Sequence, residues 1–310
     1  MSLITGLSGL KGLWSVRASL SICSARCDQA ETAWLPPRSG VLVVGHGTAD
    51  PVGAAESRQI AELVATVLPG VPVELGFLEV IGPSIDDGLA RLAAAGCREV
   101  VAAPLLLFAA GHAKRDVPEA IDSAAAAHGL RVFQTVPFGC HPAILQLSRR
   151  RRGAAVVELP PVAAAETALV MIGRGSSDPT TLLQLRQFAS ASLAGEPEFW
   201  SLGYGFVAAA RPTLREALDA ATDPTRGGVR RIVVQPHILF RGHVEEQVTV
   251  AVREARERHP GFEWVQVARL GADRLVAEAV AARVECGCKL QATCETGMKT
   301  SRQTQLESSE

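Results

Sequence analysis

A repeated set of motifs is the feature that most limits what this chain can fold into. Four landmarks of the first copy recur in the second at a slowly growing offset: Gly45-His46-Gly47 as Gly173-Arg174-Gly175 and Asp50-Pro51 as Asp178-Pro179 (both 128 residues), Pro83 as Pro212 (129), and His112 as His243 (131). Small loop insertions within one copy relative to the other make the offset grow in this way. Each copy is about 120 residues long, so the pattern indicates two domain-sized copies rather than a solenoid.

Within each copy, short apolar runs alternate with segments of helical periodicity. Strands are expected at 41–44, 73–77, 100–106, 131–136, 169–172, 200–207, 231–235 and 263–267. Helices are expected at 54–68, 85–95, 117–128, 143–150, 181–193, 213–221, 244–258 and 274–285. Alternating β and α segments predict a parallel sheet with helices on both faces. The predicted fold class is therefore α/β, with two tandem Rossmann-like domains of roughly four parallel strands each.

The domain limits follow from breaks in this alternation. The first domain is predicted at 40–152, a linker at 153–165 and the second domain at 166–285. The four arginines at 149–152 are interpreted as a solvated helix end. Residues 1–39 are expected to be a disordered or misassigned N-terminal extension, with a transit-like role left open, and 286–310 a polar tail that contains cysteines.

Composition excludes several classes of function. Lys plus Arg total 31 against 32 Asp plus Glu, a net charge of −1, and Tyr204 is the only tyrosine, which together argue against a nucleic-acid binder. Seven cysteines is an odd number for a disulfide scaffold, so a reducing cytoplasm is expected. Apolar runs shorter than about 18 residues predict no membrane span.

Three polar side chains follow predicted strands of the first copy. His46, Glu79 and His112 each come after a different strand. Ligands of doubly wound sheets bind at the carboxyl ends of strands, and two imidazoles with one carboxylate suit a divalent metal with open positions. The second copy keeps His243 but has Arg174 and Ala208 at the other two positions. The first copy thus carries the predicted metal site, and the second is degenerate.

These residues resemble a known family. The segments 43–51 (VVGHGTADP) and 105–118 (LLLFAAGHAKRDVP) are similar to the two motifs of the CbiX-type sirohydrochlorin chelatases, and Phe77-Leu78-Glu79 occupies the place of the family's acidic residue. The resemblance covers residues 40–285 and matches the long, two-domain form. It implies a class II chelatase that inserts Co²⁺ or Fe²⁺ into sirohydrochlorin without nucleotide, in cobalamin or siroheme biosynthesis. It implies no further cofactor and leaves the choice of metal open.

The resemblance also implies roles for particular residues. A neutral imidazole at His46 or His112 accepts a pyrrole proton near pH 7, and Glu79 completes the metal's shell or relays protons. The acceptor is an acidic tetrapyrrole, so cations are expected around it. The substrate-binding candidates are Lys114, Arg115, Arg174, Arg241 and His243.

Cysteines in the tail leave three alternatives open. Some long members of the family carry an iron–sulfur motif here, and this chain has Cys286, Cys288 and Cys294. Their spacing is not a standard cluster motif. An iron–sulfur cluster, a metal-handling tail and no role at all stay open.

The same residues disfavour rival functions. Asp50 stands where a dinucleotide fingerprint needs glycine, and no G-x-S-x-G is present for a serine hydrolase. A histidine phosphatase is disfavoured because Gly45, and not arginine, precedes His46. His141 is interpreted as a helix-start residue. A non-catalytic metal carrier or tetrapyrrole-binding protein remains the alternative, and a monomer is preferred to a homodimer because duplication can replace dimerisation.

Overall fold

Each half of the chain contains a parallel four-stranded sheet. The computed structural model describes residues 35–108, 115–223 and 227–288. The first sheet has the order β2-β1-β3-β4, and the second has the order β6-β5-β7-β8. The elements of the first half are β1 (Ser39–Gly45), α1 (Pro51–Val67), β2 (Val73–Phe77), α2 (Ile85–Ala94), β3 (Glu99–Pro104), α3 (Asp116–His128), β4 (Arg131–Gln134) and α4 (Pro142–Val156).

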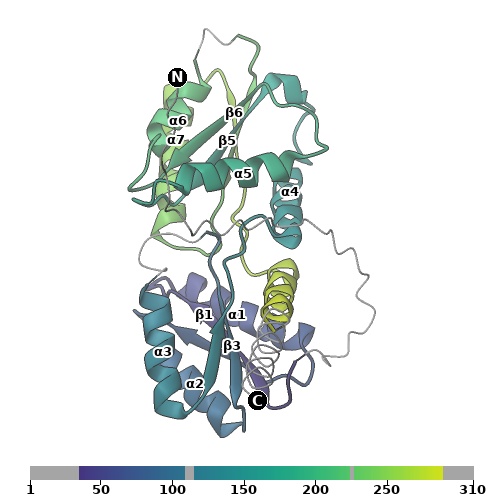
Figure 1. The fold of residues 1–310 in the computed structure, drawn as a ribbon. Coiled ribbons are helices and arrows are strands. Elements are labelled where there is room, and N and C mark those ends of the chain that lie inside the picture. Colours follow the sequence, from purple (N-terminus) through teal and green to yellow (C-terminus); the bar gives the residue numbers. More distant parts are fainter. Residues whose placement is uncertain (1–34, 109–114, 224–226, 289–310) are drawn as a thin grey trace, which may run out of the picture. The chain divides into compact units, whose positions relative to one another are not determined.

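The second half repeats this succession. Its elements are β5 (Thr167–Gly173), α5 (Thr181–Leu193), β6 (Ser201–Phe206), α6 (Leu214–Ala221), β7 (Arg231–Pro236), α7 (His243–Arg258), β8 (Glu263–Gln266) and a final helix over 274–288. Helices cover both faces of each sheet, as Figure 1 shows. The central strands β1 and β5 are buried along their whole length, which explains their continuous apolar sequence. The predicted fold class is confirmed.

Local details recur at the offsets found in the sequence. Pro83 and Pro212 both follow a cis peptide bond. Directly after them, Ser84 and Thr213 each form a capping box that begins α2 and α6. A hydroxyl and a carboxylate three residues apart satisfy two backbone N–H groups at such a helix start. The duplication inferred from spacing is therefore confirmed by the backbone.

The run of arginines does not form a solvated helix end, so that interpretation was wrong. Helix α4 continues to Val156, and Arg152 is only 4% exposed. Arg152 Nη1 donates to Gln235 Oε1 on β7 at 2.8 Å, and its Nη2 donates to Glu196 Oε1 at 2.6 Å. Arg149 donates to the carbonyls of Ala191 and Ser192 at the end of α5. The arginines attach α4 to the second half because that half supplies their acceptors.

The final helix makes the reciprocal contact with the first half. Arg283 Nη2 donates to the Phe138 carbonyl at 2.6 Å, just beyond β4. Val280 and Val284 are fully buried in the same core cluster as Ile60 of α1. The last helix of each half thus packs on the other half, and both sheets belong to one compact unit.

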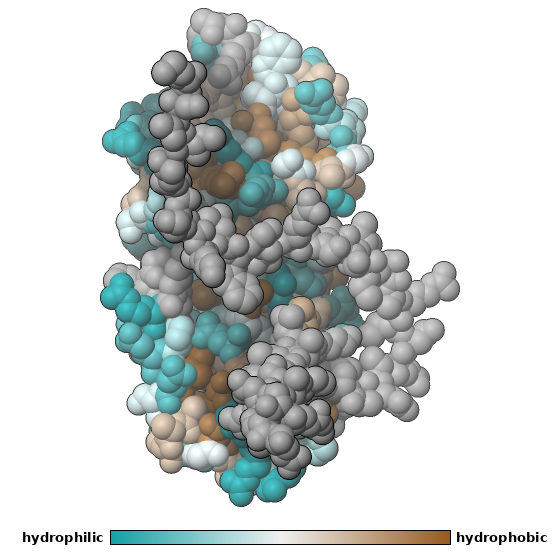
Figure 2. Space-filling model, viewed as in Figure 1, coloured by the Kyte–Doolittle hydropathy of each residue, from teal (hydrophilic) through white to brown (hydrophobic). Residues whose placement is uncertain are grey.

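No described helix is both long enough and apolar enough to span a bilayer. Figure 2 shows hydrophilic residues interspersed with smaller apolar areas over the face in view.

Candidate functional site

His46 and Glu79 meet at the carboxyl edge of the first sheet. His46 is the first residue after β1, and Glu79 lies just beyond β2. The pairing of these two strands continues past their ends, because Glu79 N donates to the His46 carbonyl at 3.1 Å. His46 Nδ1 lies 3.4 Å from Glu79 Oε1, and the two side chains are 45% and 59% exposed. An imidazole and a carboxylate therefore converge at an open edge, as the sequence predicts.

The glycine after His46 allows this close approach. Gly47 has a φ of +102°, and a Cβ there would lie 1.9 Å from the Glu79 carbonyl oxygen. Any side chain would push the two loops apart. Three residues later, the Asp50 carboxylate caps α1 by accepting from the amides of Val52 and Gly53, with Pro51 in the first turn. The motif from His46 to Pro51 is thus a predicted ligand followed by a tight turn and a helix start.

Outside the described residues lie His112 of the predicted metal site and Lys114 of the predicted substrate contacts. Strand β3, which precedes them, pairs directly with β1. The pairing continues past the strand, since Leu105 N donates to the Val44 carbonyl at 2.8 Å. Among the residues that the structure describes, no group of three His, Cys, Asp or Glu side chains is placed to hold a metal. The third ligand therefore stays a prediction.

The second half has the same backbone arrangement without the predicted ligands. Ala208 N donates to the Arg174 carbonyl at 2.9 Å, as Glu79 N donates to His46. Gly175 has a φ of +89°, and a Cβ there would lie 1.8 Å from the Ala208 carbonyl oxygen. Arg174 and Ala208 therefore occupy the places of His46 and Glu79, as the spacing predicts. This edge has a cation where the first half has an imidazole and a carboxylate.

The predicted substrate-binding residues have different surroundings. Arg115 and Arg174 are exposed. Arg241 is engaged, because its Nε lies 3.4 Å from Asp50 Oδ2 in the first half. His243 begins α7, and its Nε2 lies 2.8 Å from Gln247 Nε2. Substrate contact by these residues stays a prediction.

The buried histidine His237 was not among the residues predicted for the site. His237 follows β7, is 5% exposed, and its ring centroid lies 3.9 Å from that of Phe188 and 4.9 Å from that of Phe108. Burial lowers the pKa of His237 to about 3, so the ring is neutral. Within the described residues its Nε2 has no hydrogen-bond partner. The sequence signal that could have identified it is its position in the repeat. The residue of the first half in the equivalent position is Leu105, which is buried.

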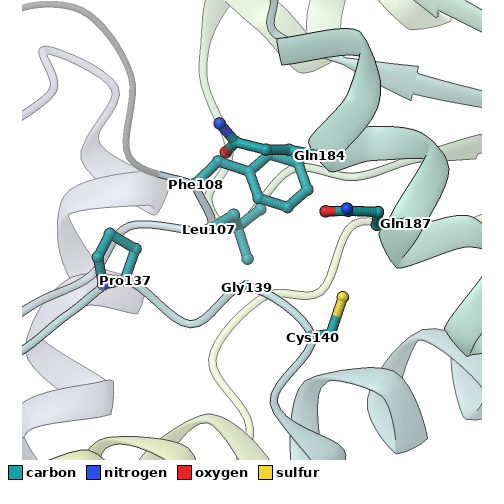
Figure 3. A pocket seen from close by; sticks show the side chains of 7 residues that line it. All are labelled: Leu107, Phe108, Pro137, Gly139, Cys140, Gln184 and Gln187. Atoms are coloured by element: carbon teal, nitrogen blue, oxygen red, sulfur yellow. The ribbon is translucent and has the colours of Figure 1, made fainter. Parts of the chain in front are cut away.

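A pocket of about 160 Å³ adjoins Phe108. Figure 3 shows Gln184 and Gln187 of α5 on one side of it and Cys140 on another. Its other lining residues are Leu107, Pro137 and Gly139.

His141, which follows Cys140 in the chain, caps α4 by accepting from Ala143 N at 3.3 Å, and this confirms its helix-start role. Burial, reinforced by Arg283, lowers the pKa of His141 to about 4, so it too is neutral.

The two tail cysteines that the structure describes lie in different environments. Cys286 is exposed, whereas Cys288 is 8% exposed and belongs to the core cluster of the final helix. Residues two apart on a helix are separated by about 200° around its axis, so these thiols do not converge on one ion. Cys294 lies outside the described residues. The iron–sulfur cluster therefore stays an untested alternative.

Comparison with known proteins places both halves in one family. The CbiX family model matches residues 40–155 and 168–286. A sirohydrochlorin cobaltochelatase of Priestia megaterium is 26% identical over 83% of this chain and 83% of its own length. A sirohydrochlorin ferrochelatase of the same organism is 30% identical over 67% of this chain and 76% of its own length. The structure of SirB from Bacillus subtilis with Fe³⁺ is 25% identical, covers 80% of this chain and 94% of its own, and has a TM-score of 0.68. Since the family model matches more than half of the residues and does so twice, this chain belongs to the CbiX family.

Proposed function

We propose that this protein inserts Co²⁺ or Fe²⁺ into sirohydrochlorin, with no nucleotide and no resident cofactor. The observation that carries the proposal is the His46–Glu79 pair at the carboxyl edge of the first CbiX-type half. Relatives along most of the chain are named for these two metallations, and the SirB structure contains iron. The metal is a substrate here, so its ligands must release it.

The chemistry of the pair suits a transient metal site. Imidazole and carboxylate bind Co²⁺ and Fe²⁺ without the strong preference that thiolates have for other metals. Because both side chains are about half exposed, coordination positions stay open toward the tetrapyrrole. In the proposal, His112 supplies a third ligand. Metallation also releases two pyrrole protons, which His46 and His112 accept in their neutral forms and Glu79 passes to water.

The second half is proposed to bind the acidic substrate. Arg174 is an exposed cation at the position that His46 has in the first half, and Arg115 precedes α3 on the metal-bearing half. Guanidinium groups bind carboxylates in bidentate fashion, so both suit the rim of a site for a polycarboxylate. Lys114 and His243 are proposed as further substrate contacts. A cytoplasmic monomer completes the proposal, supported by the odd cysteine count and the internal duplication.

A turnover assay tests this function. Sirohydrochlorin in large excess over protein is mixed with Co²⁺, and separately with Fe²⁺ or Ni²⁺, and its absorbance change is followed anaerobically. The proposal expects conversion of many equivalents, with His46→Ala inactive but folded. Conversion that stops at one equivalent would identify a metal carrier or a tetrapyrrole-binding protein instead. The relative rates with the three metals would show which one the site prefers.

A further inference from the structure

Arg269 joins the two halves through two carboxylates. Its Nε and Nη2 donate to Glu56 Oε1 at 3.0 and 2.6 Å, and its Nη1 lies 3.0 Å from each oxygen of Glu245. Glu56 belongs to α1 of the first half, whereas Glu245 belongs to α7 of the second. The side chains of Arg269, Glu56 and Glu245 are only 23%, 13% and 15% exposed.

Arg241 makes a second connection beside the first. Its backbone N donates to Glu56 Oε2 at 2.9 Å, and its Nε lies 3.4 Å from Asp50 Oδ2. The backbones also meet closely, because a Cβ at Gly53 would lie 2.2 Å from the Arg241 carbonyl oxygen. The loop that leads into α7 therefore sits directly on the first turn of α1. Asp50, which caps that turn, is four residues beyond His46.

These contacts are of the kind that fixes an orientation. A guanidinium bound by two carboxylates at short distances has little freedom to rotate, and its removal leaves two largely buried carboxylates without their positive partner. Exposed pairs such as Arg215–Asp219 on α6, where the arginine is 72% exposed, contribute little by comparison. These contacts therefore hold the second half in a fixed orientation against α1, the helix that follows the loop of His46.

We propose that Arg269, Arg241, Glu56, Glu245 and Asp50 form a latch that holds the second half in one orientation against α1, and that the tetrapyrrole binds only in this orientation. Arg241 and Arg269 are then positioning residues, and Arg241 serves the substrate through Asp50 rather than by direct contact. The latch itself stands on the contacts above, whereas its effect on tetrapyrrole binding rests on the proposed function.

The test compares Arg269→Met with Arg215→Met in the full-length protein. KM for sirohydrochlorin and the affinity for Co²⁺ alone, by titration calorimetry, are measured for both variants. Arg269→Met is expected to raise KM about tenfold and leave Co²⁺ affinity unchanged, because about one molecule in ten then presents both halves correctly. Arg215→Met is expected to change neither. An unchanged KM, or a loss of Co²⁺ affinity that would place the effect in the His46 loop, overturns the proposal.

Small-angle X-ray scattering tests the latch independently of activity. Arg269→Met should broaden the distribution of interatomic distances, and Arg269→Lys, which keeps the positive charge, should broaden it less. Glu56→Gln, which keeps the shape of the side chain, replaces Arg269→Met in both measurements where the latter does not fold. Scattering identical to that of the unmodified protein overturns the latch. A protein that fails to metallate sirohydrochlorin while its scattering responds as expected overturns the proposed function alone.

Discussion

His46 Nδ1 lies 3.4 Å from Glu79 Oε1, and the backbone N of Glu79 donates to the carbonyl of His46 at 3.1 Å. The same two residues are thus held together twice, once through the peptide groups and once through the side chains. Because the backbone bond continues the pairing of β1 with β2, the side chains are positioned by the sheet before any metal arrives. In the proposed function, metal binding by this pair would therefore need little further ordering of the protein.

Removing either side chain should weaken metal binding without unfolding the protein. Both groups are about half exposed, so His46→Ala and Glu79→Gln create no cavity and bury no charge. We expect His46→Ala to abolish metallation and Glu79→Gln to lower Co²⁺ affinity at least about tenfold, on the scale of altered metal ligation. Titration calorimetry measures the affinity. The control is His128→Ala, which removes a histidine that pairs with Asp86 at the end of α3. Equal affinities in all variants would rule out the site.

Grafting the ligands onto the second half should create a second metal site. Arg174 and Ala208 have the backbone contact of His46 and Glu79, and His243 is already present. The double variant Arg174→His with Ala208→Glu is expected to bind an additional Co²⁺ ion, counted by equilibrium dialysis. Arg174→His alone is the matched control. Unchanged stoichiometry in the double variant would show that the halves differ in more than these side chains.

Replacing His237 should reduce the loss of stability in acid. Its pKa is about 3 in the folded protein against about 6.5 when unfolded, so between these values the unfolded state binds the extra proton. His237 therefore contributes its full stability above pH 6.5, and this contribution falls as the pH drops from 6.5 toward 3. His237→Leu, which copies Leu105 of the first half, should flatten the free energy of unfolding over pH 7 to 4.5.

The contribution of His237 to the pH dependence of stability has an upper limit, and a second variant serves as its control. One titrating group changes the unfolding free energy by at most about 1.4 kcal/mol per pH unit. His141 titrates in part of the same range, because its pKa is about 4. The variant His141→Asn keeps a side chain that can cap α4, and the change in its pH slope measures how much of the acid destabilisation comes from His141. A pH slope in His237→Leu equal to that of the unmodified protein would show that His237 is accessible to protons.

Arg152→Met should destabilise the protein strongly. Arg152 is 4% exposed and donates to Gln235 and Glu196, so its loss leaves Glu196 unpaired at the junction of α4 with the second half. We expect a loss of about 3 kcal/mol in urea unfolding. Arg150→Met removes an arginine that is 53% exposed in the same helix and should cost under about 1 kcal/mol. Equal losses would mean that the buried network does not hold α4.

Local sequence patterns were sufficient for the fold class, the duplication and the His46–Glu79 pair. Strand and helix periodicity are properties of a few neighbouring residues, and parallel strands bring their carboxyl ends to one edge. The correspondence of Arg174 to His46 and of Ala208 to Glu79 needed only the offsets of 128 and 129 residues between the two copies. These features were predictable because each depends on spacing along the chain and not on which distant segment lies opposite.

Contacts between distant segments were decided only by the tertiary structure. A run of four arginines has the same appearance whether it faces water or, like Arg152, the buried Gln235 of the other half. Likewise, nothing near Arg241 in the chain indicates that Asp50 and Glu56 lie against it. The burial of His237 between Phe108 and Phe188 depends on three segments at once. The environment of a charged or titratable side chain is set by whatever packs around it, and that information lies in the fold rather than in the residue's sequence neighbours.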